Sequence, residues 1–120
     1  MTDDQLEQEI QAKGLTAPRI TPDHIEATIA HQYFFTAAEA LAARYEGGFI
    51  DPALNVLTFC VLVLKNGFTV TGESACARPE NFDVEIGRTI ARQNAMQKIW
   101  ALEGYLLKNQ IATYVKELTA

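Results

Sequence analysis

One stretch decides the fold of this chain: Leu64–Leu107, LKNGFTVTGESACARPENFDVEIGRTIARQNAMQKIWALEGYLL. A tight turn, a polar loop and a long amphipathic segment follow one another there. Asn66-Gly67 favours the positive φ values of a type I′ turn, and it separates the apolar run Val56–Leu64 from the alternating residues Phe68–Thr71. We therefore predict an antiparallel hairpin whose first strand, VLTFCVLVL, is apolar enough to be buried on both faces.

A long helix is predicted after the hairpin. An ordered loop over Gly72–Glu80 leads into a helix over about residues 82–108, capped by Asn81. Its apolar stripe consists of Ile86, Ile90, Ala95, Ile99, Leu102 and Leu106. A glycine within a helix costs roughly 1 kcal/mol relative to alanine, so Gly87 indicates close packing and Gly104 indicates a bend or an end.

Helices are also predicted before the hairpin. Residues 2–13 form a short peripheral helix, and Thr21-Pro22-Asp23 supplies a threonine cap, a proline at the first helical position and an acid in the first turn. A second helix is predicted over Pro22–Arg44, because apolar residues recur there at approximately helical spacing. The residues His31–Thr36 are poorer helix formers, which leaves a break or a loop as an alternative.

These elements predict an α+β fold with N-terminal helices, a two-stranded antiparallel β-hairpin and a long C-terminal helix. With 120 residues, 48% of them apolar, the chain has the size of one domain. We divide it into an N-terminal helix and linker over 1–20, a single α+β domain over 21–110, and a tail over 111–120 that continues the helix or frays. A two-stranded sheet is marginal alone, so we expect a homo-oligomer.

Charge and hydropathy argue against several classes of protein. The net charge of −5 argues against a protein that holds nucleic acid mainly through phosphates. The acidic start MTDDQLEQEI is neither a secretory signal nor a transit peptide, and no apolar run reaches the roughly 18 residues of a membrane helix. We expect a soluble intracellular protein with no membrane contact. Cys60 in the apolar run and Cys76 in a polar loop predict reduced thiols, with Cys60 buried.

Several motifs together indicate a family. The NGF turn, GES, the loop PENFD, the helix start EIGR and the segment IWALEGYL resemble a family of small tailed-phage proteins, known from the gene 49 product of a coliphage and the gene 66 product of a Shigella phage. The resemblance covers roughly Ile25–Leu107. It implies a phage or prophage origin and a role in the cytoplasm of the infected bacterium, as an accessory protein that redirects host machinery or counters host defence. It carries no functional residue over to this chain.

The best candidate for a binding site is an anion pocket. Arg88 and Arg92 are one helical turn apart, and two guanidinium groups at this spacing hold phosphates by paired hydrogen bonds. Ser74, Asn81 and Lys65 would add further donors, as would the free N–H groups at the helix start. Such a pocket would fit a nucleotide. The competing interpretation is that both arginines form ion pairs on a solvated face, with acids at the helix start or with a neighbouring subunit.

No catalytic or metal-binding set can be assembled from the remaining residues. His24 and His31 are seven residues apart, about 10 Å along a helix, which is too far for one metal ion. Ser74 lacks the second glycine of a G-x-S-x-G nucleophile elbow, since position 76 is cysteine. A Cys76 nucleophile and a carboxylate pair from the acids between 73 and 85 stay open as weaker alternatives. We expect no enzyme activity, no metal and no cofactor.

Aromatic residues gather at two places. Trp100 and Tyr105 lie on the long helix and Tyr33 begins the cluster YFF; such rings stack on a base or, more commonly, pack in a core or subunit interface. We expect a non-enzymatic phage accessory protein that binds a host protein or sequesters a small nucleotide-like defence signal. The alternative is a nucleic-acid-binding accessory of phage replication or transcription, which would use the cations Arg88, Arg92, Lys98 and Lys108.

Overall fold

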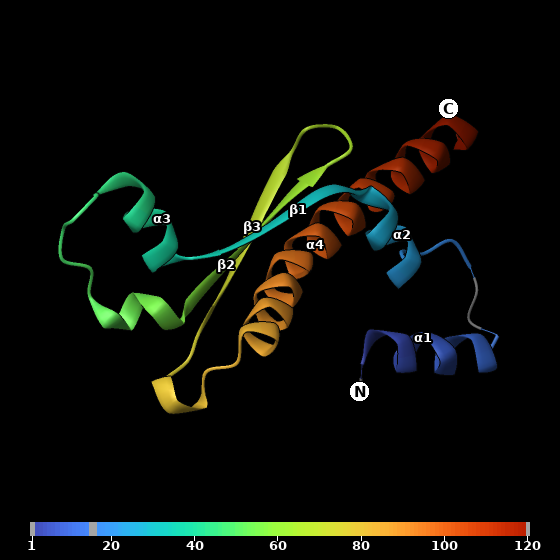
Figure 1. Cartoon of the computed structure of the whole chain (residues 1–120). Helices are drawn as coiled ribbons and strands as arrows, with labels where there is room; N and C mark the ends of the chain where they lie inside the picture. The colour runs from blue at the N-terminus through green and yellow to red at the C-terminus, as the bar shows by residue number, and fades with distance from the viewer. Residues whose placement is uncertain (1, 15–16, 120) are drawn as a thin grey trace. The chain divides into compact units, whose positions relative to one another are not determined.

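The computed structural model of the chain describes residues 2–14 and 17–119 and has an α+β fold (Figure 1). Its helices and strands are α1 (Asp3–Ala12), α2 (Pro22–Thr28), β1 (Ile29–Thr36), α3 (Ala37–Arg44), β2 (Leu57–Leu64), β3 (Thr69–Ala75) and α4 (Val84–Thr119), with two short 3-10 helices, η1 (Pro52–Val56) and η2 (Pro79–Asn81). They form two compact units, one over residues 29–98 and one made of the residues up to Thr28 and from Ile99 onward. Residues 15–16 of the predicted linker lie outside the described residues.

The sheet has three antiparallel strands in the order β1-β2-β3, so the prediction of a two-stranded hairpin is incomplete. The predicted helix Pro22–Arg44 is wrong in its middle, where β1 pairs with β2 from Ile29 opposite Leu64 to Thr36 opposite Thr58. The sequence of β1, IAHQYFFT, is rich in β-branched and aromatic residues. Its pairing with an apolar strand more than 20 residues later overrides the approximately helical spacing.

The hairpin between β2 and β3 is confirmed, but its turn differs from the prediction. Gly67 has φ 87°, and no non-glycine residue among those described has a positive φ, so Asn66 is not left-handed as a type I′ turn requires. The Gly67 N–H donates to the Leu64 carbonyl at 2.9 Å, and the Leu64 N–H donates to the Phe68 carbonyl at 2.8 Å. This is a longer turn closed by a left-handed glycine. The strand β3 runs to Ala75, so the predicted loop begins later than Gly72.

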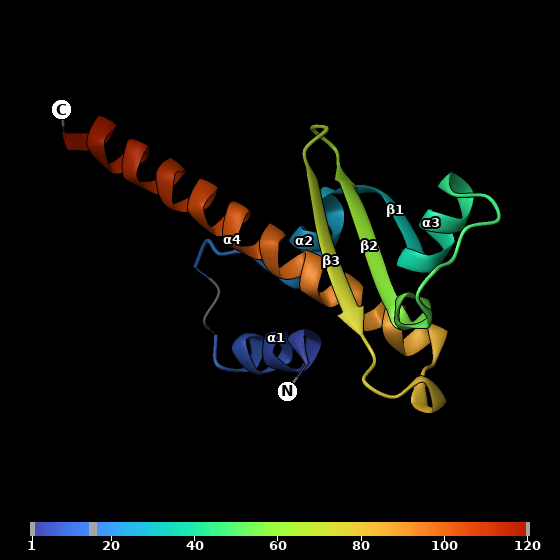
Figure 2. The ribbon, with the colours of Figure 1, turned by 90° about the vertical axis from the view of Figure 1, so that its left-hand side faces the viewer.

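The central strand has one buried face, and the prediction that both faces are buried is wrong. Thr58, Cys60, Leu62 and Leu64 are buried, whereas the residues between them are half-exposed. The buried face lies against the first turns of α4, which crosses the sheet in Figure 2. The approach is close at Gly72, where a Cβ atom would lie 2.2 Å from the Ala91 carbonyl oxygen.

The N-terminus of α4 is fixed by Asp83. Its Oδ1 accepts the Ile86 N–H at 3.0 Å, so the prediction that Asn81 caps the helix is wrong. Close packing at Gly87 is confirmed, because a Cβ there would lie 3.0 Å from Thr58 Oγ1. The helix does not end at Gly104, since α4 continues to Thr119 and includes most of the predicted tail. Among the described residues, no helix is long and apolar enough to cross a membrane.

A polar contact attaches α1 to the segment that follows it. Thr2 forms a reciprocal capping box with Gln5, which confirms the predicted start of the first helix. Arg19 donates to both carboxylate oxygens of Glu7, at 2.6 and 2.5 Å, and both side chains are largely covered. The Arg19 hydrogen bonds, with a smaller contribution from Gln11, lower the pKa of Glu7 from 4.5 to about 2.

The Glu7–Arg19 pair predicts a pH-dependent attachment of α1. Because the pKa of Glu7 is lower in the folded state, its contribution to stability is full above pH 4.5 and is lost as the pH falls towards about 2. Hydrogen exchange of the α1 amides should therefore show protection in the wild type that exceeds that of Glu7→Gln at neutral pH and converges with it towards pH 2. Glu9→Gln, which breaks only the exposed 3.2 Å pair with Lys13, is the control. If the α1 amides of Glu7→Gln showed the same pH dependence of protection as those of the wild type, the assignment of this dependence to Glu7 would be contradicted.

Candidate functional site

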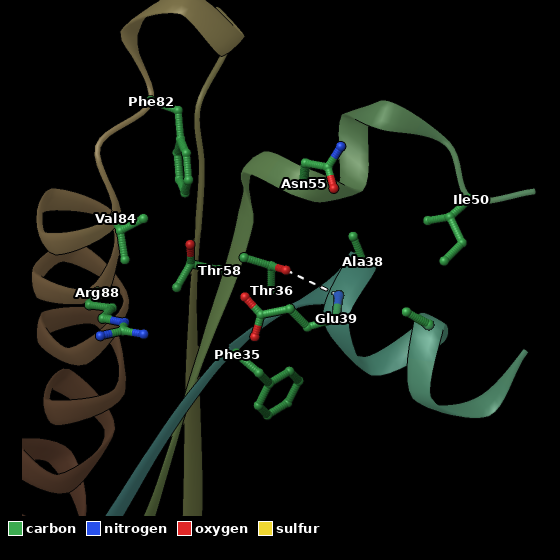
Figure 3. Close-up of a pocket in the computed structure, with 11 residues that line it drawn as sticks. Phe35, Thr36, Ala38, Glu39, Ile50, Asn55, Thr58, Phe82, Val84 and Arg88 are labelled. Carbon is green, nitrogen blue, oxygen red and sulfur yellow. Dashed lines mark hydrogen bonds between the residues drawn. The ribbon is translucent and has the colours of Figure 1, made fainter. Parts of the chain in front are cut away.

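A cavity of about 380 Å³ lies where β1 ends and α3 begins (Figure 3). It is bounded by β1 and β2, by α3 and η1, and by Phe82 and the first turns of α4. The side chains that give it its chemistry are Phe35, Thr36, Glu39, Thr58, Phe82 and Arg88. The position follows from the topology, because β1 is an edge strand and its C-terminal end has no further strand beside it.

Thr58 provides an unpartnered polar group in this cavity. Its residue is 3% exposed and its hydroxyl finds no hydrogen-bond partner among the described residues. The alternation of β2 turns Thr58 towards α4, and the missing side chain of Gly87 makes room for the hydroxyl. A buried hydroxyl without a partner costs roughly 1–3 kcal/mol, so this position favours a group that can hydrogen-bond to it.

Arg88 provides the positive charge. Its guanidinium carbon lies 5.7 Å from the centre of the Phe34 ring, and its Nη1 lies 3.6 Å from Glu85 Oε1. The ion pair predicted as the competing role of this arginine is therefore present. It is long and its Glu85 side chain is 82% exposed, so it holds the arginine weakly. A guanidinium group in this position keeps donors available for an anion in the cavity.

The other predicted ligand-binding residues lie outside the lining of this cavity. Arg92 donates from Nε to Gln32 Oε1 at 2.8 Å and from Nη1 to Met96 Sδ at 3.0 Å. Ser74 lies on β3 opposite Thr58, with β2 between it and the cavity edge of the sheet. Lys65 follows the far end of β2, about 23 Å along the strand from Thr58. Asn81 lies in η2.

Sequence reasoning did not single out Thr58 or Glu39, and it named Phe35 only as part of the aromatic cluster YFF. A signal existed for Thr58, because it is the single hydroxyl residue in the otherwise apolar strand LTFCVLVL. No comparable signal marked Glu39, since it was assigned to one long helix.

The aromatic residues proposed for packing or stacking belong to different units. Trp100 is half-buried and Tyr105 is exposed, both on the C-terminal part of α4. Tyr33 is exposed on β1. It lies on the sheet face opposite α4, where Phe35 and Phe59 stack with ring centres 5.6 Å apart.

The remaining reactive side chains lie apart from the cavity lining. Cys60 is fully buried, as predicted, and burial raises its pKa. The Cys76 Sγ donates to the Arg78 carbonyl at 3.1 Å. His24 Nε2 lies 2.9 Å from Glu103 Oε2, and His31 is exposed on β1. Within residues 2–14 and 17–119, no group of three or more His, Cys, Asp or Glu side chains is placed to hold a metal ion.

Comparison with known proteins gives the family of the chain. The model of the phage protein (N4 Gp49/phage Sf6 gene 66) family matches residues 20–111, which is most of the chain and includes the sheet, the cavity and most of α4. No curated protein and no solved structure matches the chain. The chain therefore belongs to the phage protein (N4 Gp49/phage Sf6 gene 66) family, as the motifs around the hairpin and the long helix indicated.

Proposed function

We propose that this phage protein acts by binding, and that the cavity at the end of β1 takes a small anionic, nucleotide-like ligand in the infected cell. The observation that carries the proposal is that a buried, unpartnered Thr58 hydroxyl and the Arg88 guanidinium belong to residues that line the same cavity. An anionic oxygen that displaced the packing around Thr58 would accept hydrogen bonds from both groups. Hydrogen bonds to a charged group are worth more than neutral ones, which favours an anion over water.

The rest of the lining supports a ligand with a flat, polar ring. Phe35 and Phe82 line the cavity, and the ring of Phe82 offers apolar surface for a base. The Glu39 carboxylate accepts N–H groups and carries a charge opposite to that of Arg88, so the cavity favours a ligand with both donors and an anionic group. A volume of about 380 Å³ lies at the lower end of small-molecule sites, which fits one mononucleotide-sized ligand.

Sequestration is the role that this site supports. The lining contains a cation, a carboxylate and hydroxyl groups, which can hold a polar ligand, while the thiols of Cys60 and Cys76 lie elsewhere. Membership of a phage family supports a role during infection. A protein that retains a small nucleotide-like signal would lower the free concentration of that signal. It would thereby antagonise a host defence that responds to the signal.

Titration of defined nucleotides tests the proposal. We expect one member of a panel of nucleoside monophosphates, cyclic mononucleotides and cyclic dinucleotides to bind the wild type, and Arg88→Gln to weaken its binding about 10- to 100-fold. Thr58→Val should also weaken the binding while leaving the free protein equally or more stable, because it removes the unpartnered hydroxyl. The control is Arg78→Gln, an exposed arginine outside the lining. Full affinity in Arg88→Gln would contradict the proposal.

A host protein is the second candidate partner, favoured by the outer face of the sheet. The apolar side chains of this face, half-exposed or exposed, are Tyr33, Phe35, Phe59, Val61 and Val63, and they lie beside polar residues of the neighbouring strands such as Thr71 and Glu73. A mixed apolar and polar surface of this kind is suited to pairing with another protein surface. Val61→Lys should then remove one stoichiometric partner captured from infected cells, whereas Arg88→Gln should retain it.

A further inference from the structure

The C-terminal part of α4 carries a heptad pattern. Its residues on one stripe follow one another at alternating spacings of four and three: Trp100, Gly104, Leu107, Ile111, Tyr114 and Leu118. Five of the six are apolar or aromatic side chains, over about 28 Å of helix. A spacing that averages 3.5 residues is typical of a coiled-coil seam, in which the stripe of one helix packs against the stripe of another.

This stripe becomes more exposed towards the end of the helix. Trp100 and Leu107 are half-buried, whereas Ile111, Tyr114 and Leu118 are 41%, 61% and 67% exposed. Three large side chains that share one helix face and remain this exposed form a contiguous apolar surface. Such a surface is stabilised when a partner covers it.

We infer that this stripe is the seam of a parallel two-stranded coiled coil between two copies of the chain. The heptad places Gly104, Ile111 and Leu118 at position a, and Trp100, Leu107 and Tyr114 at position d. Leu107 at d and Ile111 at the following a form the middle of the seam, and leucine at d with isoleucine at a favours two parallel strands. A second copy supplies the same stripe in the same register, which gives a closed twofold interface.

Charges beside the seam agree with the parallel arrangement. Glu103 occupies position g and Lys108 occupies the next position e, five residues later. In a parallel pair, position g of one helix faces that position e of the other, so the symmetric dimer brings two Glu103–Lys108 pairs together. In an antiparallel pair g faces g and e faces e, and this match is lost. The Glu103 carboxylate uses Oε2 for its 2.9 Å contact with His24.

The seam is short, so its association should depend on concentration. Fewer than three heptads bury a small area, and the glycine at one a position contributes no side chain to it. We therefore expect a dimer with a dissociation constant on the order of 1–100 µM rather than a permanent assembly. This dimer is independent of the proposed ligand cavity, which lies in the other compact unit.

Sedimentation of the full chain at concentrations below and above the expected dissociation constant tests the inference. We expect the wild type to pass from monomer to dimer, and Ile111→Lys to remain monomeric with unchanged helical circular dichroism. Ala112→Lys, one position further and outside the seam, should dimerise like the wild type. A wild type that stays monomeric at the highest concentration, or a dimer that survives Ile111→Lys, would overturn the seam.

Charge reversal tests the orientation. Glu103→Lys should weaken the dimer, and Glu103→Lys combined with Lys108→Glu should restore it, because the double variant recreates both pairs in the parallel register. A double variant that dimerises as weakly as the single variant would overturn the parallel arrangement. Circular dichroism of each variant separates loss of association from loss of folding.

Discussion

Gly72→Ala should destabilise the protein by about 3 kcal/mol, at the upper end of the cost of overpacking. A Cβ at this position would lie 2.2 Å from the Ala91 carbonyl oxygen and 2.3 Å from the Ala95 nitrogen. Both atoms belong to the backbone of α4, so no side-chain rotation relieves the clash and the helix must move away from β3. Ala91 and Ala95 are fully buried, which means that this movement opens the core. Denaturant unfolding at a fixed protein concentration measures the change.

Gly104→Ala is the matched control for this substitution. A Cβ at Gly104 meets nothing within 4 Å, and the residue lies inside α4. The same chemical change should therefore stabilise the protein by about 1 kcal/mol, because alanine has the higher helix propensity. Equal stability of Gly72→Ala and the wild type would show that α4 does not pack on β3 at this distance.

Leu62→Ala should cost about 2–5 kcal/mol of unfolding free energy, the range for a large-to-small change in a core. Leu62 is fully buried at the centre of β2, between Gln32 on β1 and Val70 on β3. Its removal leaves a cavity under α4, because the surrounding strands are held by their backbone pairing and collapse only partly. Thermal or denaturant unfolding reports the loss.

Val61→Ala provides the comparison on the opposite face of the same strand. Val61 is half-exposed and pairs with Tyr33 and Thr71 across the outer face of the sheet. Its truncation should cost about 1 kcal/mol, since less apolar surface returns to water. Similar losses for Val61→Ala and Leu62→Ala would contradict the assignment of one buried and one half-open face.

Local sequence signals predicted much of the fold. The short helix α1, the hairpin around Gly67 and the close approach at Gly87 all depend on residues near one another in the chain or on the small size of glycine. The strand β1 was missed for the opposite reason. Its pairing with β2 is non-local, and the spacing of the apolar residues around it imitates a helix.

The candidate site was less predictable because it depends on β1. Arg88 was identified from its place on α4, and it lines the cavity. Arg92 was expected beside it, but Gln32 on the unpredicted strand accepts its Nε hydrogen bond at 2.8 Å. Phe35 and Glu39 reach the cavity only because the chain leaves β1 and turns into α3 at Thr36. Their role follows from the tertiary arrangement rather than from spacing.

Native mass spectrometry of the protein purified gently from infected bacteria tests the central claim most directly, since it weighs any ligand retained in the cavity. The proposed sequestration predicts a nucleotide-sized mass added to the wild type and to Arg78→Gln, and its loss from Arg88→Gln. Wild-type protein that carries no added mass and binds no member of the nucleotide panel would contradict the account.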